Sequence, residues 1–133
     1  MIVGIADTHS VIWYLSRDKR LSYRAEHFIE QAASQGNQIG IASITLVEIV
    51  YLIERNRIPV ESFSKLAEEL ASHESVFIEV PLSLKIVRRL SEVEALQIPD
   101  MPDRIIAASA YHLSVPIITR DARILSSGME AIW

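Results

Sequence analysis

The sequence predicts an α/β fold in three layers, with a central parallel sheet of four or five strands flanked by helices. Short apolar runs alternate along the chain with longer stretches of helical periodicity, the pattern of a doubly wound sheet. Half of the 133 residues are hydrophobic, a high share for a small protein, and this suits strands that are covered on both faces. The length fits one core, so we expect a single domain over residues 1–133.

In the first half of the chain, two short apolar runs each end in polar residues and lead into a helical stretch. Ser22 suits an N-cap, and the stretch after it places Ala25 and Ile29 on one face until Gly36-Asn37 breaks the pattern. In order, the expected elements are a strand at Met1–Ala6, a helix near Val11–Leu15, a helix from Ser22 to about Ser34, a strand at Ile39–Ala42 and a helix from Thr45 to about Glu54.

In the second half, prolines mark the boundaries. Pro59 precedes an amphipathic stretch, Pro102 suits the first turn of an apolar helix, and Pro116 ends that helix. In order, the expected elements are a helix at Val60–Ser72, a strand at Val76–Val80, a largely helical Leu82–Leu96, a helix from Pro102 that includes Ile105–Ala110, a strand at Val115–Ile118, a short helix around Ile124-Leu125 and an edge strand at Ala131–Trp133.

Composition excludes several classes of protein. No apolar run approaches the roughly 20 residues of a membrane helix. The N-terminus has no basic leader and reaches an acid at position 7, which argues against a signal peptide. The absence of cysteine removes disulfides, thiolate metal sites and cysteine nucleophiles. We therefore expect a cytoplasmic protein that does not interact with a membrane.

The charge distribution leaves a nucleic-acid partner open. A net charge of −4 argues against such a partner, yet ten of the thirteen basic residues are arginines, which bind phosphate in a bidentate manner. Solvated helix faces explain the same bias equally well. The basic clusters are Arg17, Lys19, Arg20 and Arg24; Arg55 and Arg57; Arg88 and Arg89; and Arg120 and Arg123.

Acidic residues recur where predicted strands end. Asp7 follows the first strand, Asp121 follows the fourth, Asp100 and Asp103 open the helix that leads into the fourth, and Glu48 lies one helical turn after the second. Ligands of parallel sheets gather at the carboxyl ends of strands, so these acids are expected at one edge.

Each acid also has a purely structural explanation. Thr45-Leu46-Val47-Glu48 matches a capping box, in which the glutamate reaches back to the cap. Asp7, Asp103 and Asp121 would complement the positive ends of helix dipoles, a gain of about 0.3–1 kcal/mol each.

Glu48 is the acid least easily explained in this way. It is the only charge between Gln38 and Ile53, its neighbours Val47, Ile49 and Val50 indicate burial, and no basic residue lies one turn away. An unpaired buried carboxylate costs several kcal/mol, so a cation is the economical partner.

The acids as a group favour a hard cation. Converging carboxylates repel one another unless a cation neutralises them, and an oxygen-only ligand set selects Mg²⁺ or Mn²⁺. Zinc is disfavoured because the four histidines are scattered, and only His9 lies near the proposed site. Divalent ions held by carboxylates most often act on phosphates.

Four segments together resemble the PIN domain, and more narrowly the VapC-type ribonuclease toxins of toxin–antitoxin systems. The resemblance runs over the whole chain. Each motif is weak alone, but four in this order are specific. The segments are DTH at 7–9, SITLVEI at 43–49, DMPDR at 100–104 and PIITRD at 116–121.

The resemblance implies a parallel-sheet nuclease that cleaves RNA with Mg²⁺ or Mn²⁺, forms a homodimer and is silenced by a cognate antitoxin. Met101-Pro102 replaces the family's proline and phenylalanine, which affects local packing. The matching acids are Asp7, Glu48, Asp103 and Asp121, with Asp100 as an accessory acid and Thr8, Ser43 and Thr119 as hydroxyl positions of the pocket.

Two further roles follow as hypotheses. Arg104 or Arg120 would steady a phosphate, although Arg104 could equally pair with Asp100. Trp13, Tyr14 and the helix over Leu46–Ile53 are candidates for an apolar antitoxin-docking surface, and an ordinary core explains them as well.

Three alternatives remain at this point. A haloacid-dehalogenase-like phosphatase needs an acid two residues after Asp7, where the chain has His9. A receiver-like signalling domain needs a lysine after its last strand, where the chain has Thr119-Arg120-Asp121. The third alternative is an inactive PIN-like binding module.

Overall fold

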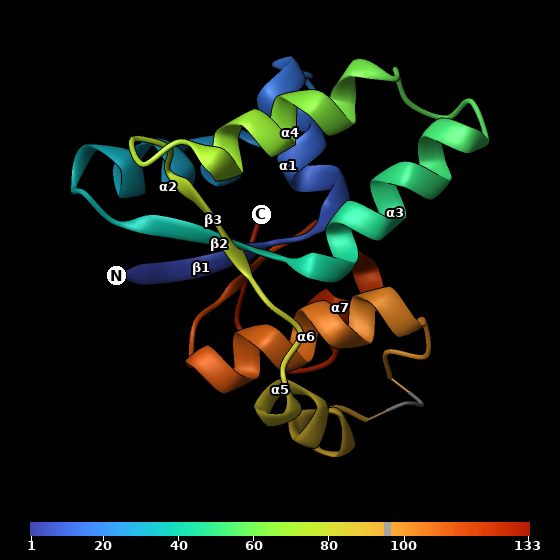
Figure 1. Ribbon diagram of the computed structural model, residues 1–133. Coiled ribbons are helices and arrows are strands. Elements are labelled where there is room, and N and C mark those ends of the chain that lie inside the picture. Colours follow the sequence, from blue (N-terminus) through green and yellow to red (C-terminus); the bar gives the residue numbers. More distant parts are fainter. Residues whose placement is uncertain (95–96) are drawn as a thin grey trace.

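The computed structural model describes residues 1–94 and 97–133, and within them the chain forms a five-stranded sheet whose paired strands are all parallel. Figure 1 shows the sheet between two groups of helices, so the predicted three-layer α/β fold is confirmed. The strand order is β3-β2-β1-β4-β5. The strands are β1 (Ile2–Ala6), β2 (Gln38–Ala42), β3 (Phe77–Val80), β4 (Ile117–Ile118) and β5 (Ala131–Ile132).

The two faces of the sheet are covered by different helices because side chains alternate along each strand. Ala6 and Ile118 face the first core, whereas their neighbours Ile5 and Ile117 face the second. Among the described residues, no helix is both long and apolar enough to cross a membrane. The first core is covered by α1 (Thr8–Ser16), α2 (Tyr23–Ser34), α3 (Ser43–Glu54) and α4 (Glu61–Ala71), the second by α5 (Leu84–Arg89), the 3₁₀ helix η1 (Leu90–Glu92), α6 (Met101–Leu113) and α7 (Ala122–Ser126).

The stretch Leu82–Leu96 is largely helical, as expected, but it is divided into α5 and η1. Ser83 caps α5 through its side chain, and the chain passes into a single 3₁₀ turn at Leu90. Arg104 then donates hydrogen bonds to the carbonyls of Leu90 and Val93, which takes up backbone acceptors at the end of this segment. The last two positions of the expected helix, 95 and 96, lie outside the described residues.

Two helices begin earlier than predicted. Asp7 is the N-cap of α1, so that helix starts at Thr8 instead of near Val11. Helix α3 starts at Ser43 with Ala42 as its N-cap and no side-chain cap bond. The expected capping box at Thr45–Glu48 is therefore wrong, and both of its polar side chains turn toward α1.

The sheet topology creates a switch point at the carboxyl ends of β1 and β4. The chain runs from β1 to β2 and β3 on one side, and β4 returns on the other side of β1. The backbone N–H of Asp7 donates to the carbonyl of Ile118 at 3.1 Å, which holds the two strand ends together. Ligands of open parallel sheets bind at such a crevice.

Candidate functional site

An open cavity of about 500 Å³ lies at this switch point. Five acids and three arginines line it, from segments far apart in the sequence. The lining residues are Asp7, Thr8, His9, Trp13, Arg20, Glu48, Asp100, Asp103, Arg120, Asp121 and Arg123.

Asp7 is fixed in place by hydrogen bonds to both of its carboxylate oxygens. Oδ1 accepts from the backbone N–H of Ser10 at 2.9 Å, and Oδ2 accepts from the hydroxyl of Thr119 at 2.5 Å. The Thr119 oxygen in turn accepts from the backbone N–H of Asp121 at 2.9 Å. This chain of bonds ties the acid after β1 to the acid after β4.

Glu48 reaches the cavity from the first half of α3. The hydroxyl of Thr8 donates to its Oε1 at 2.5 Å, and the hydroxyl oxygens of Thr8 and Thr45 lie 3.1 Å apart. The apolar neighbours from which burial of Glu48 was expected are not all buried themselves, since Val47 and Val50 are 48% and 39% exposed and only Ile49 is fully buried. Glu48 itself is half-buried. Burial raises its pKa, with a further rise from nearby carboxylates and an opposing effect of the Thr8 hydrogen bond.

Asp100 and Asp121 each cap a short turn of backbone at the cavity. Asp100 Oδ2 accepts from the N–H of Asp103 at 3.3 Å. Asp121 Oδ1 accepts from the N–H groups of Arg123 and Ile124 at 2.8 and 3.3 Å. Asp100 is thus the N-cap of α6 and Asp121 that of α7, but capping does not account for their convergence on one cavity.

Asp103 shows that the acids form one electrostatic group. Its pKa is raised from 3.8 to about 7, chiefly by burial and then by the carboxylates of Asp100, Asp121, Glu48 and Asp7, in that order. Four acids from four other positions thus act on a single side chain. Carboxylates arranged in this way hold protons near neutral pH unless a cation neutralises them.

The five acids of the cavity offer carboxylate oxygens, which are the ligands that hard cations such as Mg²⁺ prefer. In residues 1–94 and 97–133, however, no three acidic or histidine side chains are close enough to hold one ion between them. Binding an ion would therefore draw these carboxylates closer together. The raised pKa of Asp103 is the observation that fits such an ion, since a cation would relieve the repulsion that causes it.

Sequence reasoning did not assign Arg20 and Arg123 to the site, although the structure places both in the cavity wall. Trp13 lies beneath two guanidinium groups: the central carbon of Arg120 is 4.6 Å from the indole centre and that of Arg20 is 5.0 Å away. Only the clustering of arginines in the sequence pointed to these positions.

Three expected pocket residues, Arg104, Ser43 and Thr119, do not line the cavity. Arg104 donates to the carbonyls of Leu90 and Val93 at 2.6 and 3.0 Å, so its guanidinium neither lines the cavity nor pairs with Asp100. Ser43 donates to Glu79 at 2.7 Å and is also absent from the lining. These first two expectations are corrected by hydrogen bonds that the sequence does not reveal. Thr119 is fully buried, and its hydroxyl donates a hydrogen bond to Asp7.

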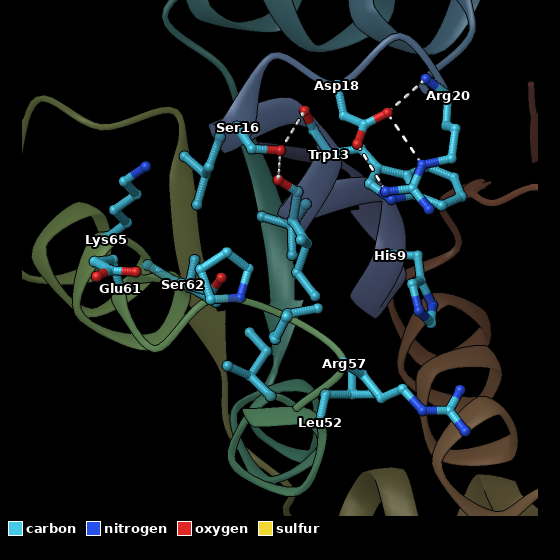
Figure 2. A pocket seen from close by; sticks show the side chains of 17 residues that line it. His9, Trp13, Ser16, Asp18, Arg20, Leu52, Arg57, Glu61, Ser62 and Lys65 are labelled. Carbon is cyan, nitrogen blue, oxygen red and sulfur yellow. Dashed lines mark hydrogen bonds and ion pairs between the residues drawn. The ribbon is translucent and has the colours of Figure 1, made fainter. Parts of the chain in front are cut away.

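A larger cavity of about 650 Å³ adjoins the acidic one between α1, α3 and α4. His9, Trp13 and Arg20 belong to both cavities. Figure 2 shows these residues together with the Asp18–Arg20 contact and the polar residues of α4. The apolar wall of this larger cavity includes Ile49 and Leu52 of α3.

Tyr14, expected on a docking surface, does not line either described cavity. Its ring packs edge-on against Phe77 at 5.5 Å between centroids, within the first core. Burial is the first cause of its raised pKa. For Tyr14 the core explanation is the correct one.

Comparison with known proteins gives a consistent result. The model of the PIN domain family matches residues 5–127. Ribonuclease VapC22 of Mycobacterium tuberculosis is 29% identical over 131 residues, which cover 95% of this chain and 92% of that protein.

Solved structures share the fold at low sequence identity. VapBC2 from Rickettsia felis, bound to a DNA fragment from its promoter, has a TM-score of 0.71 at 19% identity and covers 98% of this chain and 97% of that chain. A toxin–antitoxin complex from Klebsiella pneumoniae has a TM-score of 0.64 at 20% identity, with 98% and 96% coverage. DNA-bound VapBC from Salmonella typhimurium has a TM-score of 0.65 at 17% identity, with 98% and 97% coverage.

Proposed function

The chain belongs to the PIN domain family, and from this premise we propose that it is a metal-dependent ribonuclease, the toxin of a toxin–antitoxin pair. The name of the VapC22 relative supports the ribonuclease activity. The toxin–antitoxin complexes among the structural neighbours support the biological role.

One observation carries the proposal: acids from separate segments of the chain converge at the switch point and act together on Asp103. This position at the carboxyl edge is where a parallel sheet binds its ligand. An all-carboxylate group suits a cation that bridges the protein and a phosphate.

We assign the cation, Mg²⁺ or Mn²⁺, to Asp7, Glu48, Asp103 and Asp121. When bound, such an ion polarises a phosphoryl oxygen and lowers the pKa of a coordinated water. Asp7 is the fixed member of the group because both of its oxygens already accept hydrogen bonds.

Glu48 is in addition the candidate general base. Its raised pKa makes it a better proton acceptor than an ordinary exposed glutamate, and the Thr8 hydroxyl fixes its Oε1. Glu48 would orient the attacking water and take its proton, so that hydrolysis proceeds without a covalent enzyme intermediate.

The direct test is cleavage of single-stranded RNA by the purified chain with Mg²⁺ or Mn²⁺. We expect Asp7→Asn and Asp103→Asn to abolish cleavage and to weaken Mn²⁺ binding measured by calorimetry. Glu68→Gln, on the exposed face of α4, is the matched control and should cleave normally. Cleavage retained in both site variants would refute the assignment.

The same experiment separates the alternatives. Wild-type protein that binds RNA but never cleaves it would be an inactive PIN-like module. Stable phosphorylation of an aspartate by a small phosphodonor would instead indicate the phosphatase or receiver chemistry.

We also propose a cognate antitoxin that covers the acidic cavity. The adjoining 650 Å³ cavity offers the apolar side chains of Ile49 and Leu52, and the acids would attract a basic side chain of the partner. Co-expression with the product of a neighbouring gene should give a complex that no longer cleaves RNA. A complex with full activity would contradict this placement.

A homodimer is the last part of the proposal. Apolar side chains stand exposed on α3 and at the start of α4, namely Val47, Val50, Tyr51, Val60 and Phe63. Covering such a patch with a second copy would remove apolar surface from water. Light scattering should give twice the mass of one chain, and Val50→Glu should reduce it to that of one chain.

A further inference from the structure

We propose that Arg120 and Arg20, stacked on the indole of Trp13, bind a backbone phosphate of the RNA strand next to the phosphate that is cleaved. The inference rests on the proposed ribonuclease function and extends it to residues that hold the substrate. We call Trp13, Arg20 and Arg120 the arginine platform. All three line the acidic cavity.

Trp13 gives the platform a rigid base. Its side chain is only 5% exposed, and its ring contacts the rings of His9 and Trp133 at 5.6 and 6.0 Å between centroids. An aromatic face attracts a guanidinium group and leaves its N–H groups free to donate hydrogen bonds to another partner. The indole therefore limits the orientations of both arginines before any substrate arrives.

Arg120 is anchored at both ends of its peptide segment. Thr119, the residue before it, is fully buried and hydrogen-bonded to Asp7, and Asp121, the residue after it, donates its N–H to Thr119. The side chain of Arg120 starts from this fixed backbone and ends 4.6 Å from the Trp13 centre. Its position relative to the acids is thus set by the same hydrogen bonds that hold Asp7.

The two arginines differ in how far their charge is neutralised. Arg20 forms a two-point ion pair with Asp18, at 2.7 Å from NH2 to Oδ2 and 3.1 Å from Nε to Oδ1, and Figure 2 shows this contact beside Trp13. Its side chain remains 61% exposed. Within the described part of the chain, Arg120 forms no ion pair within 4.0 Å.

This arrangement points to an anion as the missing partner. Both guanidinium carbons lie within 5.0 Å of one indole centre and both side chains line the acidic cavity, whereas the carboxylate of Asp18 pairs only with Arg20. A phosphate that accepts hydrogen bonds from Arg120, and from the unshared N–H groups of Arg20, would balance this charge. A single strand of RNA carries such a phosphate on each nucleotide.

The position of the platform identifies which phosphate it holds. The arginines and the five acids line the same cavity of about 500 Å³, but the acids repel a bare phosphate. A strand whose scissile phosphate lies at the acids would therefore place a neighbouring phosphate at the arginines. The platform would align the strand without taking part in bond breaking.

The test measures KM and kcat for cleavage of a single-stranded RNA oligonucleotide by Arg120→Gln and Arg120→Lys. We expect Arg120→Gln to raise KM about tenfold, the usual effect of a lost hydrogen bond to a charged group, while kcat falls far less. Arg120→Lys keeps the charge but loses the planar guanidinium group, so its KM should lie between those of wild type and Arg120→Gln. Arg24→Gln removes the same charge from an exposed position of α2 and is the control.

A second readout comes from the salt dependence of KM. The loss of one phosphate contact reduces the slope of log KM against log salt by about 0.7 for a single strand. Trp13→Phe keeps a smaller aromatic face, and we expect it to raise KM while Arg120 itself is unchanged. Circular dichroism checks that each variant is folded.

The outcomes separate this inference from the proposed function. If wild-type protein cleaves RNA but Arg120→Gln leaves KM and the salt slope unchanged, the platform is not a phosphate site and the ribonuclease function stands. If Arg120→Gln weakens only the binding of the antitoxin, the platform serves that protein and the inference is likewise refuted. If wild-type protein does not cleave RNA, the proposed function itself fails.

Discussion

Replacing Asp103 by asparagine should stabilise the protein at pH 8 in the absence of divalent ions. The pKa of Asp103 is raised from 3.8 to about 7 by burial and by four neighbouring carboxylates. The folded protein therefore holds this proton more tightly than the unfolded chain. Stability is fully present below about pH 4 and is lost as the pH rises through 7, where Asp103 becomes charged. Asparagine removes that charge at every pH.

The magnitude follows from the shift. A change of about three pKa units corresponds to roughly 4 kcal/mol, because each unit is worth about 1.4 kcal/mol. Asp103 is only half-buried, so solvent screening reduces the expected gain to about 1–2 kcal/mol. For a chain of this size, that is a rise in Tm of roughly 4–8 °C.

The assay is thermal unfolding by circular dichroism in EDTA at pH 5 and pH 8. Asp103→Asn should exceed wild type at pH 8 and by a smaller margin at pH 5, and Glu68→Gln should follow wild type at both. Adding Mn²⁺ at pH 8 should raise the Tm of wild type more than that of Asp103→Asn, because a bound ion stabilises only a fold that holds it. A Tm of Asp103→Asn at or below wild type at pH 8 in EDTA would refute the electrostatic argument.

Three other substitutions test separate features. Thr119→Val keeps the shape of the side chain but removes the hydrogen bond to Asp7. The free energy of unfolding, measured by urea titration, should therefore fall by about 1–3 kcal/mol. An unchanged value would show that the bond contributes nothing to stability. Gly40→Ala would place a new Cβ 2.5 Å from Cδ1 of Ile5, and calorimetry should show a loss of about 1–3 kcal/mol; a wild-type Tm would mean that the sheet adjusts freely. Arg104→Gln should lower stability by about 1–2 kcal/mol through its lost carbonyl contacts and leave the KM for RNA unchanged, whereas a raised KM would restore the phosphate role.

The sheet was predictable because its signals are local. Each buried strand is a short apolar run between polar residues, and the structure confirms a parallel sheet with Ala131–Ile132 as an edge strand. The helix expected over Leu82–Leu96 was not predictable in detail. The stretch is divided into α5 and a 3₁₀ turn, and Arg104 of the next helix donates hydrogen bonds to the carbonyls of Leu90 and Val93 where this turn ends.

The acidic half of the candidate site was predictable for a related reason. Acids that follow parallel strands must meet at one edge, whatever the packing between them. The arginine platform was not predictable, because it requires Arg20 from the loop after α1 and Arg120 from the β4–α7 connection to meet over the indole of Trp13. The failure of the capping box at Thr45–Glu48 was not predictable either, because both side chains form contacts with Thr8, which belongs to another helix.

The short strands at one end of the sheet limit how long the site remains assembled. β4 and β5 contribute two residues each, so few backbone bonds hold this margin, whereas β1, β2 and the paired part of β3 are longer. We therefore expect brief local opening to be concentrated there, with fast amide hydrogen exchange as its measure. Thr119 and Asp121 follow β4 directly, so each local opening would separate Asp121 from Asp7. The proposed nuclease site thus depends on the margin of the sheet that the fewest backbone bonds hold, and we expect a ligand that spans Asp7 and Asp121 to slow exchange across that whole margin.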